Sequence, residues 1–371
     1  MIIGIPKEIK THEYRVGLTP TGAETLINAG HQIIVQSQAG EAIGFTDQKY
    51  QQVGVVIVSS ADEIFEQAQM IVKVKEPQPI ECQLLKKGQI LFTYLHLAPD
   101  PHQTQLLIDS NAICIAYETI TDDFGGLPLL KPMSEVAGRM SIQSGAHHLE
   151  KTQGGSGVLL SGATGVDPAQ VLILGGGIVG MNAAEVALGM GADVTILNRS
   201  VSERLVEFQK KHSSQLSIDL SSQANIDQHL TNADLVVGAV LVTGAQAPKL
   251  ISKKMLGLMK KGSVLVDVSI DQGGCFETSK PTTHNNPTYV VDGIIHYCVG
   301  NMPSAVAQTA TLALTNATLP YIVEIANKGY QKAMLDDQNL MNGLNIHQGK
   351  ITHQAVANDL DYTYCPAVDL L

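Results

Sequence analysis

One segment, residues 171–180, restricts the possible folds of this chain more than any other. It reads Val-Leu-Ile-Leu-Gly-Gly-Gly-Ile-Val-Gly, so an apolar run leads directly into the pattern G-x-G-x-x-G at Gly175, Gly177 and Gly180. A helical run over 181–190 and a second apolar run over 193–197 come next. A strand, a glycine-rich turn, a helix and a second strand are typical of a dinucleotide-binding βαβ unit.

Each glycine of this turn has its own reason to lack a side chain. Gly175 permits the tight turn, Gly177 lets the backbone approach a pyrophosphate, and Gly180 permits close packing of the helix on the strand. The N-terminus of the helix then offers N–H groups and a positive dipole end to the phosphates. The segment therefore predicts a nicotinamide dinucleotide, and we expect NAD.

The residue that usually selects NAD over NADP differs in this chain. An acidic residue at the end of the second strand binds the ribose hydroxyls and repels a 2′-phosphate, but this position holds Asn198, followed by Arg199. An Asn side chain can bond a hydroxyl without carrying charge, and Arg199 either pairs with a phosphate or is a solvated surface residue. Our hypothesis is that NAD is the cofactor and that discrimination against NADP is relaxed.

Strand-like and helix-like patterns alternate along the rest of the chain. We expect strands at 2–5, 32–36, 55–58, 70–75, 90–96, 112–117, 171–174, 193–197, 235–238 and 263–270. Helical patterns include 19–29, 61–67, 102–109, 134–149 with Ser134 as its N-cap, and 304–326. Strands separated by helices indicate parallel sheets, and 371 residues suffice for two domains. The predicted fold class is α/β, with two Rossmann-like domains built on doubly wound, mostly parallel sheets.

Composition and charge exclude several classes of function. The net charge of −11 argues against non-specific binding of nucleic acid. The five cysteines show no C-x-x-C spacing, which is typical of reduced, buried thiols in a cytoplasmic protein. No apolar run approaches the about 18 residues that span a bilayer, and no motif of a zinc protease, serine hydrolase or P-loop occurs. We therefore expect a small-molecule substrate, with no metal, membrane or nucleic-acid partner.

Three predicted strands end in side chains that could perform chemistry. Lys75, His96 and Asp271 lie at the carboxyl ends of the strands expected at 70–75, 90–96 and 263–270, where ligands bind in open α/β sheets. By the period of two along a strand, Tyr94 should share a face with His96, and Asp267 and Ser269 with Asp271. A cation that holds a carboxylate and groups that move protons are what amino-acid or hydroxy-acid oxidation requires. The alternatives are a solvated lysine and an aspartate that only forms a turn.

Several motifs together resemble one family, the alanine dehydrogenases and the NAD-binding subunit of the proton-pumping transhydrogenases. They are Gly4-Ile-Pro-Lys-Glu8, Glu13-Tyr-Arg-Val-Gly-Leu-Thr-Pro20, Val72-Lys-Val-Lys-Glu-Pro77, Thr93-Tyr-Leu-His-Leu-Ala98, residues 173–197, Val266-Asp-Val-Ser-Ile-Asp-Gln-Gly-Gly274 and Asn301-Met-Pro303. These motifs extend over essentially the whole chain, and their combination is specific.

The resemblance implies an NAD-dependent amino-acid dehydrogenase that carries out the reversible oxidative deamination of L-alanine to pyruvate and ammonia. It implies a discontinuous substrate domain of 1–130 plus 308–371 and an NAD-binding domain of 131–307, with the active site in the cleft between them. It also implies a soluble, cytoplasmic homo-oligomer, namely a hexamer.

Roles for individual residues follow from the same resemblance. Arg15 and Lys75 would hold the substrate, and His96 and Asp271 would be catalytic. The cofactor contacts would fall on Ser134, Gly175, Gly177, Val179, Gly180, Asn198, Arg204, Ser221, Val240, Leu241, Asn301 and Met302.

Two rival functions remain open at this point. One is the NAD-binding module of a proton-translocating transhydrogenase, which would usually lack the pair of Lys75 and His96. The other is an opine- or saccharopine-type dehydrogenase, which would need a larger substrate cleft.

Overall fold

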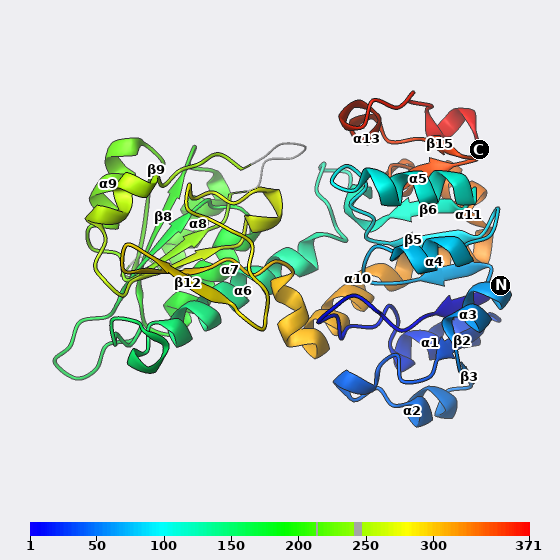
Figure 1. The fold of residues 1–371 in the computed structure, drawn as a ribbon, viewed down its shortest axis with the longest axis horizontal. Helices are drawn as coiled ribbons and strands as arrows, with labels where there is room; N and C mark the ends of the chain where they lie inside the picture. Colours follow the sequence, from blue (N-terminus) through cyan, green and yellow to red (C-terminus); the bar gives the residue numbers. More distant parts are fainter. Residues whose placement is uncertain (213, 241–246) are drawn as a thin grey trace. The chain divides into compact units, whose positions relative to one another are not determined.

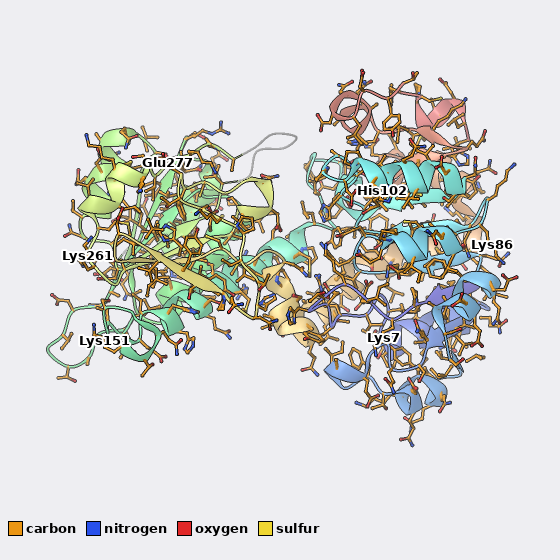
Figure 2. All side chains as sticks on the ribbon, viewed as in Figure 1. Lys7, Lys86, His102, Lys151, Lys261 and Glu277 are labelled. Atoms are coloured by element: carbon orange, nitrogen blue, oxygen red, sulfur yellow. The ribbon has the colours of Figure 1, made fainter. Side chains whose placement is uncertain are left out.

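The computed structural model describes residues 1–212, 214–240 and 247–371, which form two compact units (Figure 1). The first unit comprises Met1–Met133 and Val306–Leu371, and the second comprises Ser134–Ala305. The second unit is therefore inserted in the sequence of the first. Charged side chains such as Lys86, Lys261 and Glu277 are exposed on the two units (Figure 2).

The first unit is built on an eight-stranded sheet with the order β15-β14-β6-β5-β4-β1-β2-β3. Strands β1 to β6 are parallel, whereas β14 and β15 pair antiparallel at one edge. The order β3-β2-β1-β4-β5-β6 is that of a doubly wound dinucleotide-binding sheet. The strands are β1 (Ile2–Ile5), β2 (Gln32–Gln36), β3 (Val56–Val58), β4 (Met70–Val72), β5 (Ile90–Thr93), β6 (Ile113–Ala116), β14 (Leu344–His347) and β15 (Lys350–Ile351).

Helices connect these strands. They are α1 (Pro20–Asn28), α2 (Asp47–Gln52), α3 (Ala61–Gln67), α4 (Pro79–Leu84), α5 (Pro101–Ser110), α10 (Ala307–Lys328), α11 (Tyr330–Asp336), α12 (Gln338–Met341) and α13 (Gln354–Asp359), and a 3-10 turn, η2 (Tyr117–Thr119), follows β6. Several begin at a polar cap: Thr19, for example, accepts a hydrogen bond from the backbone N–H of Gly22 at the start of α1.

In the described part of the second unit, a seven-stranded sheet has the order β12-β13-β11-β10-β7-β8-β9. Its strands are β7 (Gln170–Leu174), β8 (Asp193–Asn198), β9 (Leu216–Leu220), β10 (Leu235–Gly238), β11 (Val264–Asp267), β12 (Thr288–Val291) and β13 (Ile294–Tyr297). All pairs are parallel except β12 with β13. Its helices are α7 (Ile178–Gly189), α8 (Glu203–Lys211) and α9 (Gln223–Leu230), with 3-10 turns η5 (Ile270–Gln272) and η6 (Met302–Val306), while α6 (Lys131–His148) begins in the first unit.

Aliphatic strands buried on both faces form the cores of the two units. Every residue of β5, β6, β10 and β11 is buried, as expected for parallel strands covered by helices on both sides. The predicted α/β class with mostly parallel, doubly wound sheets is thus confirmed.

Several sequence-based boundaries were wrong, among them the helix expected at 304–326, which runs over Ala307–Lys328. Strands β4, β5 and β11 end at Val72, Thr93 and Asp267 rather than extending to 75, 96 and 270. The first N–H group after each strand still donates to a neighbouring backbone carbonyl. The chain then leaves each sheet, and later N–H groups, namely those of Val74, His96 and Ser269, donate to carboxylates instead. Helix α6 begins at Lys131, so Ser134 lies within its first turn and is not its N-cap. Pro132 is tolerated there because the first N–H groups of a helix have no intrahelical acceptor.

Candidate active site

The carboxyl edge of the first sheet collects the candidate substrate residues in spatial order. Strands β1, β4, β5 and β6 are consecutive neighbours in the sheet. Arg15 follows β1, Lys75 follows β4 and His96 follows β5. The parallel register therefore brings to one edge three side chains that are 81 positions apart at most in the sequence.

Arg15 is buried, with 2% of its surface exposed, and is held by an acidic neighbour. Its Nε donates to Glu13 Oε1 at 2.6 Å and its Nη2 donates to Glu13 Oε2 at 2.5 Å. Its Nη1 lies 3.0 Å from the sulfur of Met133. A bidentate contact of this kind fixes the plane of the guanidinium. The direction of Nη1, the atom that could donate to a substrate carboxylate, is therefore fixed as well.

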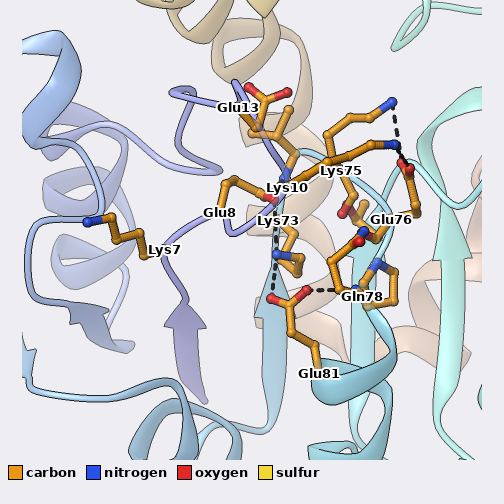
Figure 3. A network of polar contacts seen from close by, with 12 residues as sticks. Lys7, Glu8, Lys10, Glu13, Lys73, Lys75, Glu76, Gln78 and Glu81 are labelled. Atoms are coloured by element: carbon orange, nitrogen blue, oxygen red, sulfur yellow. Dashed lines mark hydrogen bonds and ion pairs between the residues drawn. The ribbon is translucent and has the colours of Figure 1, made fainter. Parts of the chain in front are cut away.

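Lys75 lies directly beside an acidic partner. Its Nζ is 3.3 Å from Glu76 Oε2, and Lys10 also pairs with Glu76 (Figure 3). Burial opposes ionisation of Glu76, but the charge of Lys75 and the contact with Lys10 dominate and lower the pKa of Glu76 to about 2. This carboxylate is therefore ionised at neutral pH, and its negative charge holds the ammonium groups of Lys10 and Lys75 beside each other after β4.

Lys73, which is fully buried, lies close to the cluster of Lys10, Lys75 and Glu76 (Figure 3). Lys73 Nζ donates to Glu8 Oε2 at 3.0 Å and to Glu81 Oε1 at 2.7 Å. The other oxygen of Glu8 accepts the backbone N–H groups of Val74 at 2.6 Å and Lys75 at 3.3 Å. Glu8 thus ties the segment after β1 to the backbone that carries Lys75.

His96 is exposed and has a left-handed backbone, with φ of 49°. Its ring stacks on that of Tyr94, with centroids 5.9 Å apart and planes 12° apart. The period-two argument for this pair was wrong, because β5 ends at Thr93, yet the two rings do lie together. The hydroxyl of Tyr94 donates to the carbonyl of Leu129 at 2.6 Å, which fixes the stacking partner in place.

In the second unit, the glycine-rich turn has the geometry that a pyrophosphate requires. Gly175 has φ of 105°, and a Cβ on Gly180 would lie 1.8 Å from the carbonyl oxygen of Gly175. A Cβ on Gly177, in contrast, would meet nothing within 4 Å. Gly177 begins α7 without a capping side-chain hydrogen bond in the described part of the chain. These residues fit a dinucleotide whose phosphates accept hydrogen bonds from the N-terminus of α7.

The side chain of Asn198 bridges two parts of the same site. Its Oδ1 accepts the N–H of Gly176 at 3.0 Å and its Nδ2 donates to the carbonyl of Ser200 at 2.8 Å. An amide can accept at one end and donate at the other, whereas an ionised carboxylate can only accept. Arg199 beside it is exposed.

Asp271 is exposed in the short turn η5, whereas Asp267 is completely buried at the end of β11. The prediction that these two aspartates share a face was therefore wrong. Asp267 accepts the backbone N–H groups of Ser269 at 3.1 Å and Cys275 at 2.9 Å and the hydroxyl of Ser279. It thereby fixes both ends of the loop that carries Asp271. Burial is the main effect on Asp267 and raises the pKa of its carboxyl group.

The other candidate cofactor residues lie near the carboxyl ends of the second sheet or at the starts of helices. Ser221 follows β9, and its N–H donates to the carbonyl of Asn198 at 2.9 Å. Val240 follows β10, and its carbonyl accepts the hydroxyl of Ser269 at 2.7 Å. The remaining positions are Ser134 in α6, Val179 in α7, exposed Arg204 in α8, Asn301 with φ of 57°, and buried Met302 in η6. Leu241 lies outside the described residues.

Sequence reasoning did not predict that carboxylates hold these loops; those that do are Glu8, Glu13, Glu118 and Asp267. Glu13 gives a local signal, because it stands two residues before Arg15. Glu118 gives none, since its contact with His96 spans 22 positions.

The described residues contain neither a cluster of metal ligands nor a membrane-spanning helix. Within 1–212, 214–240 and 247–371 no group of three or more His, Cys, Asp or Glu side chains could hold a metal ion. Over the same residues no helix has the length and apolar character needed to cross a membrane.

Comparisons with known proteins extend over both units. Residues 4–137 match the family described as alanine dehydrogenase/PNT, N-terminal domain, and residues 141–354 match alanine dehydrogenase/PNT, C-terminal domain. The chain is 55% identical to the alanine dehydrogenase of Halomonas elongata over 371 residues, covering 100% of both chains. It is 49% identical to that of Bacillus subtilis over 368 residues, covering 99% of this chain and 97% of the relative.

Solved structures give the same relationship. An L-alanine dehydrogenase structure matches with a TM-score of 0.94 at 49% identity, covering 97% of this chain and 99% of the other. A transhydrogenase from Sinorhizobium meliloti matches with a TM-score of 0.81 at 20% identity, covering 96% of this chain and 100% of the other. The second likeness concerns the fold alone.

Proposed function

The chain belongs to the alanine dehydrogenase/PNT family, and we propose that it catalyses the reversible, NAD-dependent oxidative deamination of L-alanine to pyruvate and ammonia. The observation that carries this proposal is full-length identity of 46–55% to curated alanine dehydrogenases from several organisms. The residues to which we assign the reaction follow strands of the two sheets, which supports the proposal.

We assign substrate recognition to the first unit. Arg15 pairs with the carboxylate of the substrate through the side of its guanidinium that Glu13 does not hold. Lys75 attracts the electron density of the substrate carbonyl and so favours attack at the keto carbon. A cation is effective here because it stabilises the negative charge that develops on oxygen.

We assign cofactor binding to the second unit, with the glycine turn and the N-terminus of α7 receiving the pyrophosphate. When bound, NAD would supply the acceptor for a hydride from the α-carbon of alanine, and loss of that hydride from the neutral amine leaves an iminium ion. His96 and Asp271 take the proton roles: one removes a proton from the attacking water, and protons return to the departing ammonia.

The direct test is a set of NADH-formation assays with different substrates. The proposal expects NADH formation with L-alanine and NADH consumption with pyruvate plus ammonia. Correctly folded His96→Ala and Asp271→Ala variants should lose most turnover, and near-full turnover in both would contradict the roles assigned to them.

The same assays address the two rivals. A saccharopine- or opine-type enzyme would consume NADH with pyruvate plus lysine, and a transhydrogenase module would respond to no amino acid. The alternative of a transhydrogenase module is supported by the similarity to the Sinorhizobium meliloti structure. At 20% identity this similarity shows a shared fold. Relatives at 46–55% identity favour alanine dehydrogenase instead.

For the cofactor, we propose NAD with relaxed discrimination against NADP. Asn198 supports this because its amide is engaged with Gly176 and Ser200 and it carries no charge that would repel a 2′-phosphate. Comparison of kcat/KM for NADH and NADPH tests the idea, since a preference for NADH above about 1000-fold, some 4 kcal/mol, would contradict it.

We further propose a cytoplasmic homo-oligomer, specifically a hexamer. All five cysteines are free, which supports a reducing compartment. Light scattering coupled to size-exclusion chromatography gives the mass of the assembly relative to the 39.6 kDa chain, and a monomer would contradict the proposal.

A further inference from the structure

Glu118 accepts a hydrogen bond from the backbone N–H of His96, the residue to which we assign proton transfer. It lies in the turn η2 after β6, and β6 is the sheet neighbour of β5. Its Oε1 accepts the N–H of His96 at 2.7 Å and that of Leu95 at 3.0 Å, while Oε2 is 3.2 Å from the N–H of Leu95. One carboxylate therefore receives two consecutive backbone donors at the point where the chain leaves β5.

These hydrogen bonds accompany an unusual backbone conformation. His96 has φ of 49°, a left-handed conformation that non-glycine residues adopt only at some cost. Such a conformation persists where surrounding contacts over-determine it, and it is concentrated at functional sites. Here the contacts that determine it are the two N–H groups held by Glu118.

The direction of the His96 ring has a second, independent constraint. The ring lies on the buried ring of Tyr94, at 5.9 Å and 12°, and Tyr94 is tied to the carbonyl of Leu129. Stacking restricts the side-chain torsions only if the backbone presents the ring at the correct place. The backbone contact and the stacking contact therefore act together on the same imidazole.

We propose that Glu118 is a positioning residue for the reaction, which holds the left-handed turn at His96 so that the imidazole is presented for proton transfer. This inference rests on the role of His96 in the proposed function. Glu118 acts through geometry: the acceptor oxygens matter, and the negative charge itself is secondary. The charge of Glu118 also acts on Tyr94 and His353, but burial is the main effect on both: it raises the pKa of Tyr94 and lowers that of His353.

Three substitutions separate geometry from charge. Glu118→Gln keeps an acceptor oxygen at the same reach without the charge, whereas Glu118→Asp keeps the charge but withdraws the oxygens by one methylene group. Glu118→Ala removes both. We expect the Ala and Asp variants to lose about 10- to 100-fold in kcat, since misplacement of a reacting group by about 1 Å has effects of that size. The Gln variant should retain most of the turnover.

A neighbouring residue gives a matched control. Thr119 lies in the same turn and accepts the side-chain N–H of Asn345 at 2.7 Å, away from His96. Thr119→Ala should lower the melting temperature, because the buried amide of Asn345 loses one of its two acceptors and keeps only the carbonyl of Gly343, while kcat changes little. Loss of turnover in Thr119→Ala equal to that in Glu118→Ala would show that general disturbance of the turn is responsible, and would overturn the proposal.

The decisive measurement combines Glu118→Ala with His96→Ala. If Glu118 acts through His96, the double variant should have the kcat of His96→Ala alone, and the KM for pyruvate should change much less than kcat in Glu118→Ala. Independent, multiplying losses would overturn the proposal. High turnover in His96→Ala would instead refute the role of His96 in the proposed function, so the two failures are distinguishable. If Glu118→Ala does not fold, the comparison of Gln with Asp decides, and equal turnover in these two variants would overturn the proposal.

Discussion

Charged side chains after the strands of the first sheet form ion pairs with neighbouring carboxylates, and Arg15 is the clearest case. Its Nε and Nη2 are both engaged by Glu13. We predict that Arg15→Lys lowers kcat/KM for pyruvate about 10- to 100-fold, because an ammonium cannot serve Glu13 and a substrate carboxylate in one plane and loses at least one charge-assisted hydrogen bond. Steady-state kinetics with pyruvate measure this. Arg139→Lys, at an exposed ion pair with Glu185, is the control and should leave kcat/KM unchanged.

Glu76 makes the stability of the protein sensitive to acid. Its pKa is lowered to about 2 in the folded state by Lys75 and Lys10, in spite of burial, from an ordinary value of 4.5. The stabilisation is therefore complete above the unfolded pKa and is lost as the pH falls through the folded pKa. It amounts to about 3 kcal/mol.

Urea unfolding at several values of pH tests this effect. Wild-type protein should lose more stability than Glu76→Gln between about pH 5 and about pH 2, in keeping with the linkage of protonation to folding. The matched control is Glu66→Gln, which removes an exposed ion pair with Lys86 and should barely alter the pH profile, since exposed pairs contribute little. Identical pH profiles for wild type and Glu76→Gln would contradict the prediction.

Helix α7 shows how position within one element separates folding from binding. A Cβ on Gly177 or on Gly189 would meet nothing within 4 Å. Gly177 has φ of −78°, which alanine can adopt. We predict that Gly177→Ala folds but weakens NADH binding about tenfold or more, because the new methyl group occupies the place where the backbone approaches the pyrophosphate.

Gly189 is the matched control at the other end of the same helix. Gly189→Ala should leave the Kd for NADH unchanged and raise stability by up to about 1 kcal/mol, since alanine is the better helix former. Fluorescence titration with NADH and thermal unfolding measure the two effects. Unchanged NADH affinity in Gly177→Ala would argue against the assigned pyrophosphate site.

The elements differ in how far the sequence alone could predict them. Apolar runs such as 171–174 and 235–238 have the length of buried strands and were placed correctly. The ends of β4, β5 and β11 were not, because periodicity cannot show that Glu8, Glu118 and Asp267 accept backbone N–H groups shortly after each strand. Those contacts depend on which strands become neighbours. The motifs therefore predicted candidates for the chemistry, and only the fold revealed which residues hold the loops that carry these candidates.

Taken as a whole, the chain places two doubly wound sheets in one sequence, with the second unit inserted in the first. Both have the strand order of a dinucleotide-binding sheet, so topology alone does not tell which one binds the cofactor. The distinction lies in the turn after the first strand of each. After β7 this turn contains Gly175, Gly177 and Gly180, whereas after β1 the chain continues into Pro6, Lys7 and Glu8.

From this difference we predict that NADH alone protects the second unit from hydrogen exchange. The strongest protection should fall on peptides that contain the turn at 175–180 and the segments around Asn198 and Asn301, because bound ligand stabilises the state that binds it, by about 2.7 kcal/mol at 100 times Kd. Hydrogen-exchange mass spectrometry with and without NADH measures this, and Gly177→Ala should abolish most of the effect at the same concentration. Protection confined to residues 1–133 would mean that the first sheet binds the dinucleotide, and would reverse the assignment of the two units.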